Sequence, residues 1–258
     1  MEVTILGTSA GGIPQTDCMK CRTCKSAVEN GGKDVRTRQS IIIRNGNGYS
    51  LIDADPDLRF QLLREKINLR EIKEVFLTHA HGDHIFGLYE FCVGDIRNVP
   101  IFSNRQILEN VFGKSFYFLA EFGWMVPMEL TKEIKIRNLS FLPFEVPHTP
   151  RELGPTLGFR ISENGKVLTY VPDIALFTPE VLKKLDNSDV LIFDGVFYDR
   201  LNGGHIPIAG SIPILQKLNL GEVIFTQMNH TEPTHEELEK RLKPYGYKVA
   251  YDGMKIKF

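Results

Sequence analysis

The sequence predicts an α/β fold, and three observations support this prediction. The chain has 258 residues, 42% of them hydrophobic, which is enough to bury a sizeable core. Short β-like runs alternate with helix-like segments along its whole length. No linker, low-complexity stretch or charge block interrupts this alternation. We therefore expect a single domain over residues 1–258 rather than two small ones.

The predicted strands are short runs rich in β-branched and aromatic residues, bounded by turn residues. In the first half of the chain they are Val3–Leu6, Ser40–Ile43, Tyr49–Ile52, Glu74–Thr78 and Ile101–Ser103. In the second half they are Lys135–Arg137, Ser140–Val146, Thr156–Ile161, Val167–Val171, Val190–Phe193 and Glu222–Phe225. Tight turns are predicted at Asn45–Gly48 and Glu163–Gly165. A last hairpin, Lys248–Phe258, is predicted to turn at Asp252-Gly253.

The predicted helices are segments in which apolar residues recur every three or four positions. They are Asp57–Ile67, about Asp83–Val93, Arg105–Phe112, Pro179–Leu185, Ile212–Leu218 and Thr234–Leu242. The alternation of these helices with the strands is the basis for the predicted fold class.

The motif with the most chemical information is His-Ala-His-Gly-Asp-His at residues 79–84, directly after an apolar run. Imidazole and carboxylate groups are the usual ligands of zinc and similar divalent metals. His79 and His81 are two residues apart in an extended segment, so both side chains can reach one metal. Asp83 and His84 begin the next helix and can reach a second metal. Two metals about 3.5–4 Å apart form a common hydrolytic arrangement.

A metal site needs more ligands than one turn provides, so polar residues at other strand ends are candidates. His148 follows the apolar strand that ends at Val146, and Asp173 follows the strand that ends at Val171. Each residue taken alone is typical of a turn. Their position after apolar strands, downstream of the histidine motif, favours metal ligation.

This combination resembles the metallo-β-lactamase superfamily, whose motif is a strand-terminal H-x-H-x-D-H followed by a distant His, a distant Asp and a last His. The resemblance covers essentially the whole chain. It implies a four-layer αββα sandwich with the metals at the edge of the two sheets. The implied ligands of the first metal are His79, His81 and His148. Those of the second are Asp83, His84 and Asp173, with Asp173 as a bridge.

Four further segments are similar to two branches of that superfamily, the coenzyme PQQ synthesis protein B family and the cyclic-phosphate phosphodiesterase of phosphonate breakdown. They are Leu6–Gln15, Asp194–Phe197, Gly204–Pro207 and Asn229–Pro233. In those relatives a cysteine-rich N-terminal loop meets a C-terminal histidine at a structural zinc. The resemblance therefore implies a second metal site outside the active site.

The N-terminal loop at about residues 14–26 contains three of the four cysteines, which are Cys18, Cys21 and Cys24. A closed zinc site needs four Cys or His ligands, and this loop supplies three thiolates. We predict His230 as the fourth ligand and regard Asp17 as the alternative. Three reduced thiols without a metal are the other interpretation of the cluster.

One position departs from the superfamily pattern. The last active-site histidine commonly lies three residues before the structural one, and that position is Gln227 in this chain. A neutral amide oxygen is a poorer zinc ligand than imidazole, so Gln227 is expected near the active site as a weak ligand. The second metal would then bind weakly, exchange or be absent. The alternative is that His230 serves the active site and the cysteines have another partner.

His205 lies in a glycine-rich segment at residues 202–205. A nearby histidine is the general acid of the related phosphodiesterase, where it protonates the leaving oxygen. A positioned acid typically adds about 10²–10⁴-fold to the rate. The resemblance thus makes His205, together with Asp83, a candidate catalytic residue. A surface-loop histidine is the alternative interpretation.

The composition of the whole chain argues against two classes of protein, nucleic-acid-binding proteins and membrane proteins. A formal net charge of −1 does not favour a nucleic-acid-binding protein, so we expect a small-molecule substrate. The chain has no apolar stretch of transmembrane length and no signal-peptide pattern at Met1, so we expect a cytoplasmic protein without membrane contact. Cys92 is predicted to pack in the core. The sequence leaves open whether the chain forms a homodimer.

Three functions agree with these features. The favoured one is a hydrolase with one or two divalent metals (Zn, Mn or Fe) in the active site and one structural Zn. It would cleave a small phosphodiester, cyclic ones included, through metal-activated water. The second is an iron-dependent oxygenase or biosynthetic protein, as the PQQ branch implies. The third is a non-catalytic metal-binding protein whose site decayed at Gln227.

Overall fold

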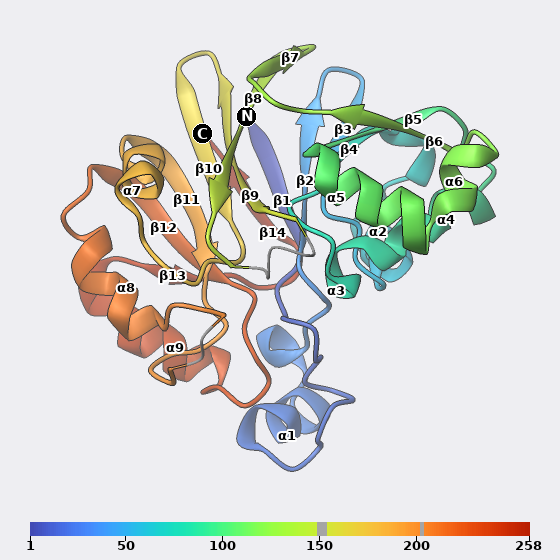
Figure 1. Ribbon diagram of the computed structural model, residues 1–258. Helices are drawn as coiled ribbons and strands as arrows, with labels where there is room; N and C mark the ends of the chain where they lie inside the picture. The colour runs from blue at the N-terminus through green and yellow to red at the C-terminus, as the bar shows by residue number, and fades with distance from the viewer. Residues whose placement is uncertain (149–153, 202–203) are drawn as a thin grey trace.

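The strands form two sheets that pack face to face in a computed structural model, which describes residues 1–148, 154–201 and 204–258 (Figure 1). The strands of the first sheet, in spatial order, are β14 (Met254–Lys257), β1 (Glu2–Gly7), β2 (Ser40–Asn45), β3 (Gly48–Ile52), β4 (Ile72–Phe76), β5 (Val99–Ser103) and β6 (Met125–Glu129). Those of the second are β13 (Lys248–Val249), β12 (Leu220–Thr226), β11 (Ser188–Asp194), β10 (Lys166–Val171), β9 (Thr156–Glu163), β8 (Leu139–Val146) and β7 (Ile134–Ile136).

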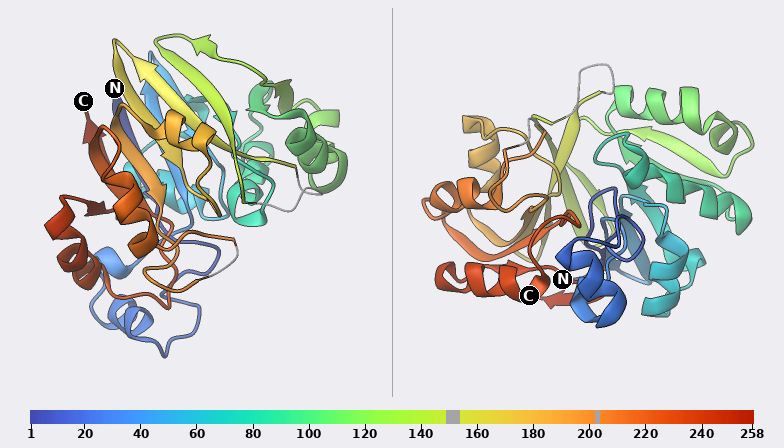
Figure 2. Two further views of the ribbon diagram at one scale, coloured as in Figure 1. Left: turned by 60° about the vertical axis from the view of Figure 1, so that its left-hand side comes forward. Right: turned by 90° about the horizontal axis from the view of Figure 1, so that it is seen from below.

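Helices cover the outer faces of both sheets (Figures 1 and 2). Those beside the first sheet are α2 (Leu58–Glu65), α4 (Tyr89–Val93), α5 (Arg105–Asn110) and α6 (Tyr117–Glu121). Those beside the second are α7 (Pro179–Leu185), α8 (Ile208–Leu215) and α9 (His235–Leu242). The predicted four-layer αββα sandwich is therefore confirmed. No helix within the described ranges has the length and apolar content that a membrane span requires.

Two apolar clusters hold these layers together. Between the sheets, Phe76 of β4 stacks on Phe141 of β8 with ring centroids 4.1 Å apart. Phe76 also meets Phe159 of β9 edge-on at 5.7 Å. On the outer face of the second sheet, buried residues of β11 and β12 pack against α7, α8 and α9. Because β11 and β12 are buried on both faces, their sequences are nearly continuous apolar runs.

Strands of both sheets direct their carboxyl ends to the same edge of the sandwich. In the first sheet β3, β4 and β5 are parallel. In the second, β10, β11 and β12 are parallel. Strand β8 runs the same way as β10 because both are antiparallel to β9. The residues that follow these strands meet at one edge, near the short helix α3 (Gly82–Ile85), which is the usual place for a site in such folds.

The predicted C-terminal hairpin is wrong. Strand β13 pairs with β12 in the second sheet, whereas β14 pairs with β1 in the first. The chain crosses between the sheets at Asp252, whose carboxylate accepts hydrogen bonds from the hydroxyl groups of Thr8 (2.7 Å) and Thr37 (2.6 Å). The turn at Asp252-Gly253 is present, but a local pattern cannot show which sheet each flanking strand joins.

The predicted helix over Asp83–Val93 is interrupted. Helix α3 is followed by a 3₁₀ turn at Phe86–Leu88 and then by α4. The interruption lets the Gly87 N–H donate to the Ala54 carbonyl at 2.8 Å. A Cβ atom at Gly87 would collide with the carbonyl oxygen of Asp55, so only glycine fits here.

Several other elements differ from prediction, among them helix α6, which was not predicted. Helix α8 begins at Ile208, directly after Pro207, and ends at Leu215, so it lies earlier than Ile212–Leu218. Helix α1 (Arg22–Glu29) within the cysteine segment was not predicted, nor was the edge strand β6. Pro127 lies inside β6, and proline in a strand pattern argues against a strand unless it lies at an edge.

Candidate metal centre

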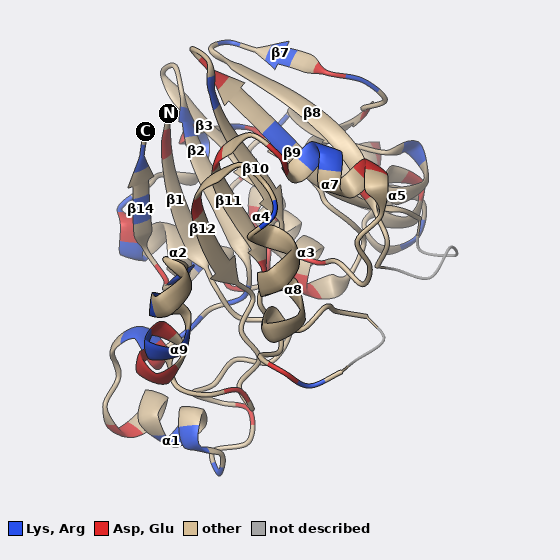
Figure 3. Ribbon diagram, turned by 90° about the vertical axis from the view of Figure 1, so that its left-hand side faces the viewer, with Lys and Arg blue, Asp and Glu red and all other residues tan. Residues whose placement is uncertain are grey.

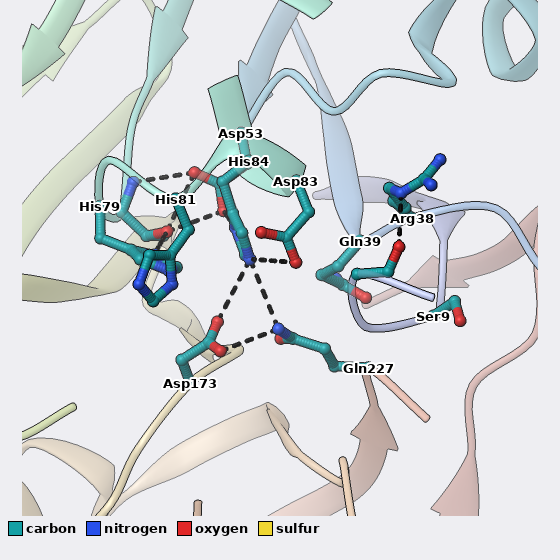
Figure 4. A network of polar contacts seen from close by, with 12 residues as sticks. Ser9, Arg38, Gln39, Asp53, His79, His81, Asp83, His84, Asp173 and Gln227 are labelled. Carbon is teal, nitrogen blue, oxygen red and sulfur yellow. Dashed lines mark hydrogen bonds and ion pairs between the residues drawn. The ribbon is translucent and has the colours of Figure 1, made fainter. Parts of the chain in front are cut away.

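The histidine motif forms the loop from β4 into α3, at the edge where the strand ends meet (Figure 4). His81 is the residue that precedes the first turn of α3. His79 and His84 are fully buried, whereas Asp83 lies at the rim with 26% of its side chain exposed. Figure 4 shows these side chains directed toward Asp173 and Gln227, which come from the second sheet. The site is therefore built across the interface of the two sheets.

Five of the six predicted active-site ligands, together with His205, form three overlapping groups, and the ligand atoms within each group lie within 4.8 Å of one another. The sixth predicted ligand, Asp83, belongs to none of these groups. The groups are His79, His81 and His148; His79, His84 and Asp173; and His148, Asp173 and His205. Asp173 is central to these groups. Its Oδ2 lies 3.4 Å from His84 Nε2, and its Oδ1 lies 3.5 Å from His148 Nε2. Asp173 thus contacts one residue predicted for each metal, and its bridging role stays a prediction.

Asp83 borders the same cluster from the side of the solvent. Its Oδ2 atom lies 3.9 Å from His84 Nε2. The backbone of Gly11 approaches it from the N-terminal segment, and a Cβ atom there would lie 3.4 Å from Asp83 Oδ2. Asp83 therefore lies between the cluster and the N-terminal loop, where a substrate can reach it.

The cluster has the chemistry of a metal site. His148 Nε2, Asp173 Oδ2 and Gln227 Oε1 are buried and have no hydrogen-bond partner within the described ranges. A buried polar atom without a partner costs about 1–3 kcal/mol. A divalent cation among these atoms would remove that cost, since nitrogen and oxygen donors are what zinc coordinates. The residues present thus fit a metal ion.

Two of the imidazoles from the motif are oriented through their other ring nitrogen. His79 Nδ1 lies 2.9 Å from the hydroxyl of Thr78, and His84 Nδ1 lies 2.9 Å from Asp53 Oδ2. Asp53 also accepts hydrogen bonds from the backbone and side chain of Thr78. Such contacts fix the tautomer and direct Nε2 at the metal position.

The imidazoles from the second sheet are held in the same way. The Gly204 carbonyl accepts a hydrogen bond from His148 Nδ1 at 2.7 Å. Asp194 Oδ2 lies 2.8 Å from His205 Nδ1. His205 has 16% of its side chain exposed and its ring centroid lies 4.8 Å from that of His148. It is therefore part of the cluster and not a surface-loop residue.

Sequence reasoning missed the orienting residues Asp53 and Asp194. Asp53 follows β3 and Asp194 ends β11, so the strand-end signal that identified Asp173 could have found both. Asp53 and Gln227 also share a left-handed backbone, each with φ of 62°. That conformation costs about 1–2 kcal/mol for a residue with a side chain, and such strain is often found at functional sites.

Protonation also matches metal binding. Burial lowers the pKa of His79, His81 and His148 below the ordinary histidine value. For His79 and His81 the neighbouring imidazoles lower it further. All three rings are therefore neutral at pH 7, the form in which imidazole binds a metal.

The opposite holds at His84. Burial alone lowers its pKa, but the charges of Asp53 and Asp173 raise it to about 10. Burial raises the pKa of Asp173 to about 7, although His84 opposes that change. This part of the site thus favours a positive charge, whether the charge is a proton or a metal cation.

Gln227 lies beside the cluster, as predicted. It follows β12, and its amide Nε2 donates to Asp173 Oδ1 at 2.8 Å and lies 3.4 Å from His84 Nε2. A half-turn of the amide would direct the unpartnered Oε1 at the same point. Gln227 can therefore offer one neutral oxygen where the superfamily pattern has an imidazole.

The cysteine loop forms a separate cluster with the C-terminal part of the chain. The ligand atoms of Cys18, Cys21, Cys24 and His230 all lie within 4.8 Å of one another. His230 Nδ1 lies 3.6 Å from Cys21 Sγ and 3.5 Å from Cys24 Sγ. A tetrahedral site with Zn–S bonds of about 2.3 Å requires spacings of this size. The alternative that His230 serves the active site does not agree with this geometry.

Asp17 does not take the position of the fourth ligand, which was the alternative prediction. Its Oδ2 lies 2.6 Å from His230 Nε2, the ring nitrogen that points away from the cysteines. Asp17 thus orients the histidine, as Asp53 does for His84. Hydrogen bonds from backbone N–H groups, that of Cys21 first, lower the pKa of Cys18 to about 6. Cys92 is half-buried and packs against the main core.

We expect Cys21→Ser to lose about one zinc ion per chain, because three ligands remain. The melting temperature should fall by at least about 5 °C, since each kcal/mol corresponds to about 2–4 °C in a chain of this size. Metal analysis and thermal unfolding measure both effects. The half-buried Cys92→Ser is the matched control and should keep its metal. Unchanged metal content in Cys21→Ser would show that the cluster holds no zinc.

We expect Gln227→His to tighten binding of a second metal in the active site by at least about tenfold, because imidazole is the better ligand. Histidine also tolerates the left-handed backbone at this position better than most residues. Competition with a chromogenic chelator measures the change. Gln216→His, at the exposed end of α8, is the control for an added histidine. Equal affinities in the two variants would contradict the assignment of Gln227 to the metal position.

Comparisons with known proteins agree with this geometry. Residues 49–256 match the family described as Beta-lactamase superfamily domain. Coenzyme PQQ synthesis protein B of Methylobacterium sp. (strain 4-46) is 29% identical, with 99% of each chain aligned. The crystal structure of Zn(2+)-bound PqqB from Methylobacterium extorquens gives a TM-score of 0.86 at 26% identity and covers 100% of both chains.

A second solved structure, a diphosphatase from the PhnP family, gives a TM-score of 0.84 at 26% identity and covers 100% of this chain and 97% of the other. The sequence resemblance to the metallo-β-lactamase fold and to its PQQ synthesis protein B and PhnP-like branches is thus confirmed. The chain belongs to the beta-lactamase superfamily.

Proposed function

We propose that this protein is a metal-dependent hydrolase that cleaves small phosphodiesters, cyclic ones included, by attack of water on phosphorus. The observation that carries the proposal is the cluster of His79, His84, His148 and Asp173, with its unpartnered atoms, beside His205. A divalent metal held there would supply a Lewis acid for a phosphoryl oxygen and would lower the pKa of water.

The chain's own residues supply the remaining functions. Asp53 and Thr78 fix the rings of His84 and His79, so the ligand nitrogens need no rearrangement when substrate binds. Asp83 lies at the open side of the cluster, where its carboxylate can accept a hydrogen bond from the attacking water. The buried position of Asp173 excludes bulk water from the floor of the site.

His205 is placed to donate a proton to the leaving oxygen. Burial alone lowers its pKa, but the hydrogen bond and charge of Asp194 raise it above the ordinary histidine value. The imidazolium is therefore available near neutral pH, which general acid catalysis requires. Its position beside His148 and Asp173 brings the proton to the edge of the metal cluster.

The similarity to a PhnP-family diphosphatase over nearly the full length of both chains supports hydrolysis at phosphorus. The similarity to coenzyme PQQ synthesis protein B is equally extensive and favours a second candidate, a biosynthetic role, for which iron is the metal expected from the sequence. The metal content and the presence or absence of phosphodiester turnover distinguish the two.

The experiment is metal analysis of protein purified without chelator, followed by an assay with bis(p-nitrophenyl) phosphate. We expect zinc or manganese and measurable turnover, reduced at least about a hundredfold in Asp83→Asn. Asp95→Asn is the control, because Asp95 is exposed and lies outside the metal cluster. Its backbone is left-handed, a conformation that asparagine adopts readily. Bound iron, oxygen consumption and no turnover would refute the proposal and support the biosynthetic candidate.

A second test distinguishes the loss of proton donation by His205 from a general loss of structure in the variant. A p-nitrophenolate leaving group needs little protonation, whereas an alkoxide needs a proton. We expect His205→Asn to lower turnover of an alkyl phosphodiester about 10²–10⁴-fold and that of bis(p-nitrophenyl) phosphate much less. The two substrates serve as controls for each other, and kcat for both is measured on one protein sample. Equal losses on both substrates would show that His205 is not the acid.

A further inference from the structure

An apolar cavity of about 540 Å³ opens beside the metal cluster and shares His205 with it. Every other described residue of its lining is apolar, including Leu176, Phe177, Leu201, Ile206, Pro207 and Ile214. Leu176 and Leu201 expose 60% and 88% of their surfaces. Exposed leucines around a concave apolar site next to reactive groups are typical of a ligand pocket.

Helix α8 forms one side of this cavity and has no charged residue (Figure 3). Ile208, Ile212 and Leu215 are buried in the core beneath the second sheet. Ile214 instead lines the cavity. Ile214 thus lies on a side of α8 that the core does not use, and its side chain adds to the apolar wall of the cavity.

A second cavity, of about 630 Å³, meets the cluster at His148 and has a different character. Asn104, Glu145, Thr178 and Glu180 contribute to its lining. The site thus has a polar approach at His148 and an apolar one at His205, whose rings lie 4.8 Å apart. A substrate with two unlike groups can be bound in only one orientation by such a pair of cavities.

We propose that the cavity beside His205 holds an apolar alkyl or aryl group carried on the leaving oxygen of the substrate. This inference rests on the proposed function. The water oxygen bonds to phosphorus while the bond from phosphorus to the leaving oxygen breaks, and the leaving oxygen takes up the proton that the attacking water releases. The products are an apolar alcohol and a phosphate monoester. Because the apolar cavity meets the cluster at His205, an apolar group held in it places the leaving oxygen on the His205 side.

The test is binding of n-alkyl phosphates with one, four and eight carbons to the zinc-loaded protein, measured by calorimetry. A methylene that becomes fully buried contributes about 0.8 kcal/mol, or about a fourfold change in Kd. We expect Kd to fall about two- to fourfold per carbon in the unmodified protein. This dependence should be lost in Leu176→Asp/Ile214→Asn, with the Kd of methyl phosphate changed less than about threefold.

Leu63→Asp is the control, since Leu63 is 74% exposed on α2 and does not line the cavity. Leu176→Asp alone serves if the double variant does not fold. A Kd independent of chain length, or a dependence that persists in the variants, would overturn the inference even if phosphodiesters are hydrolysed. Chain-length-dependent binding without turnover would instead leave the cavity assigned and refute the proposed reaction.

Discussion

The metal centre depends on one constraint of the fold, the convergence of strand carboxyl ends from both sheets. β3 and β4 of the first sheet and β8, β10, β11 and β12 of the second all end at the same edge. Each delivers a polar residue there within three positions of its end, from Asp53 to Gln227. Side chains separated by more than a hundred residues, such as His84 and Gln227, therefore meet at one buried point.

The buried carboxylates determine which imidazoles at this point carry a proton. Asp53, Asp173 and Asp194 are buried within the cluster, and the imidazoles next to them respond in opposite ways. His79, His81 and His148 are held neutral, whereas the neighbouring carboxylates favour the charged form of His84 and His205. The neutral imidazoles can bind a metal directly, whereas His84 must give up its proton to do so. His205 is the ring that can keep the proton that a general acid requires.

The cysteine cluster connects the two ends of the chain close to this centre. His230 lies three residues after Gln227, and the backbone of Met228 exchanges hydrogen bonds with Thr8 and Ala10. A metal bound by the cysteines and His230 would therefore stabilise the same C-terminal segment that places Gln227. The N-terminal segment in turn places Gly11 against Asp83. The two candidate metal sites differ in the chemistry of their ligands but share this structural support.

The sequence alone was sufficient to predict the αββα class, the convergence of His79, His81 and His84 at one site, and the grouping of the cysteines. These features are local, because spacing along one strand, turn or loop determines which side chains lie together. Only the tertiary structure showed that Lys248–Val249 and Met254–Lys257 join different sheets, that Asp53, Asp194 and Asp17 orient histidines, and that an apolar cavity adjoins His205. Each of these depends on contacts between distant segments, and a local pattern of residues holds no information about which distant segment will pack against it.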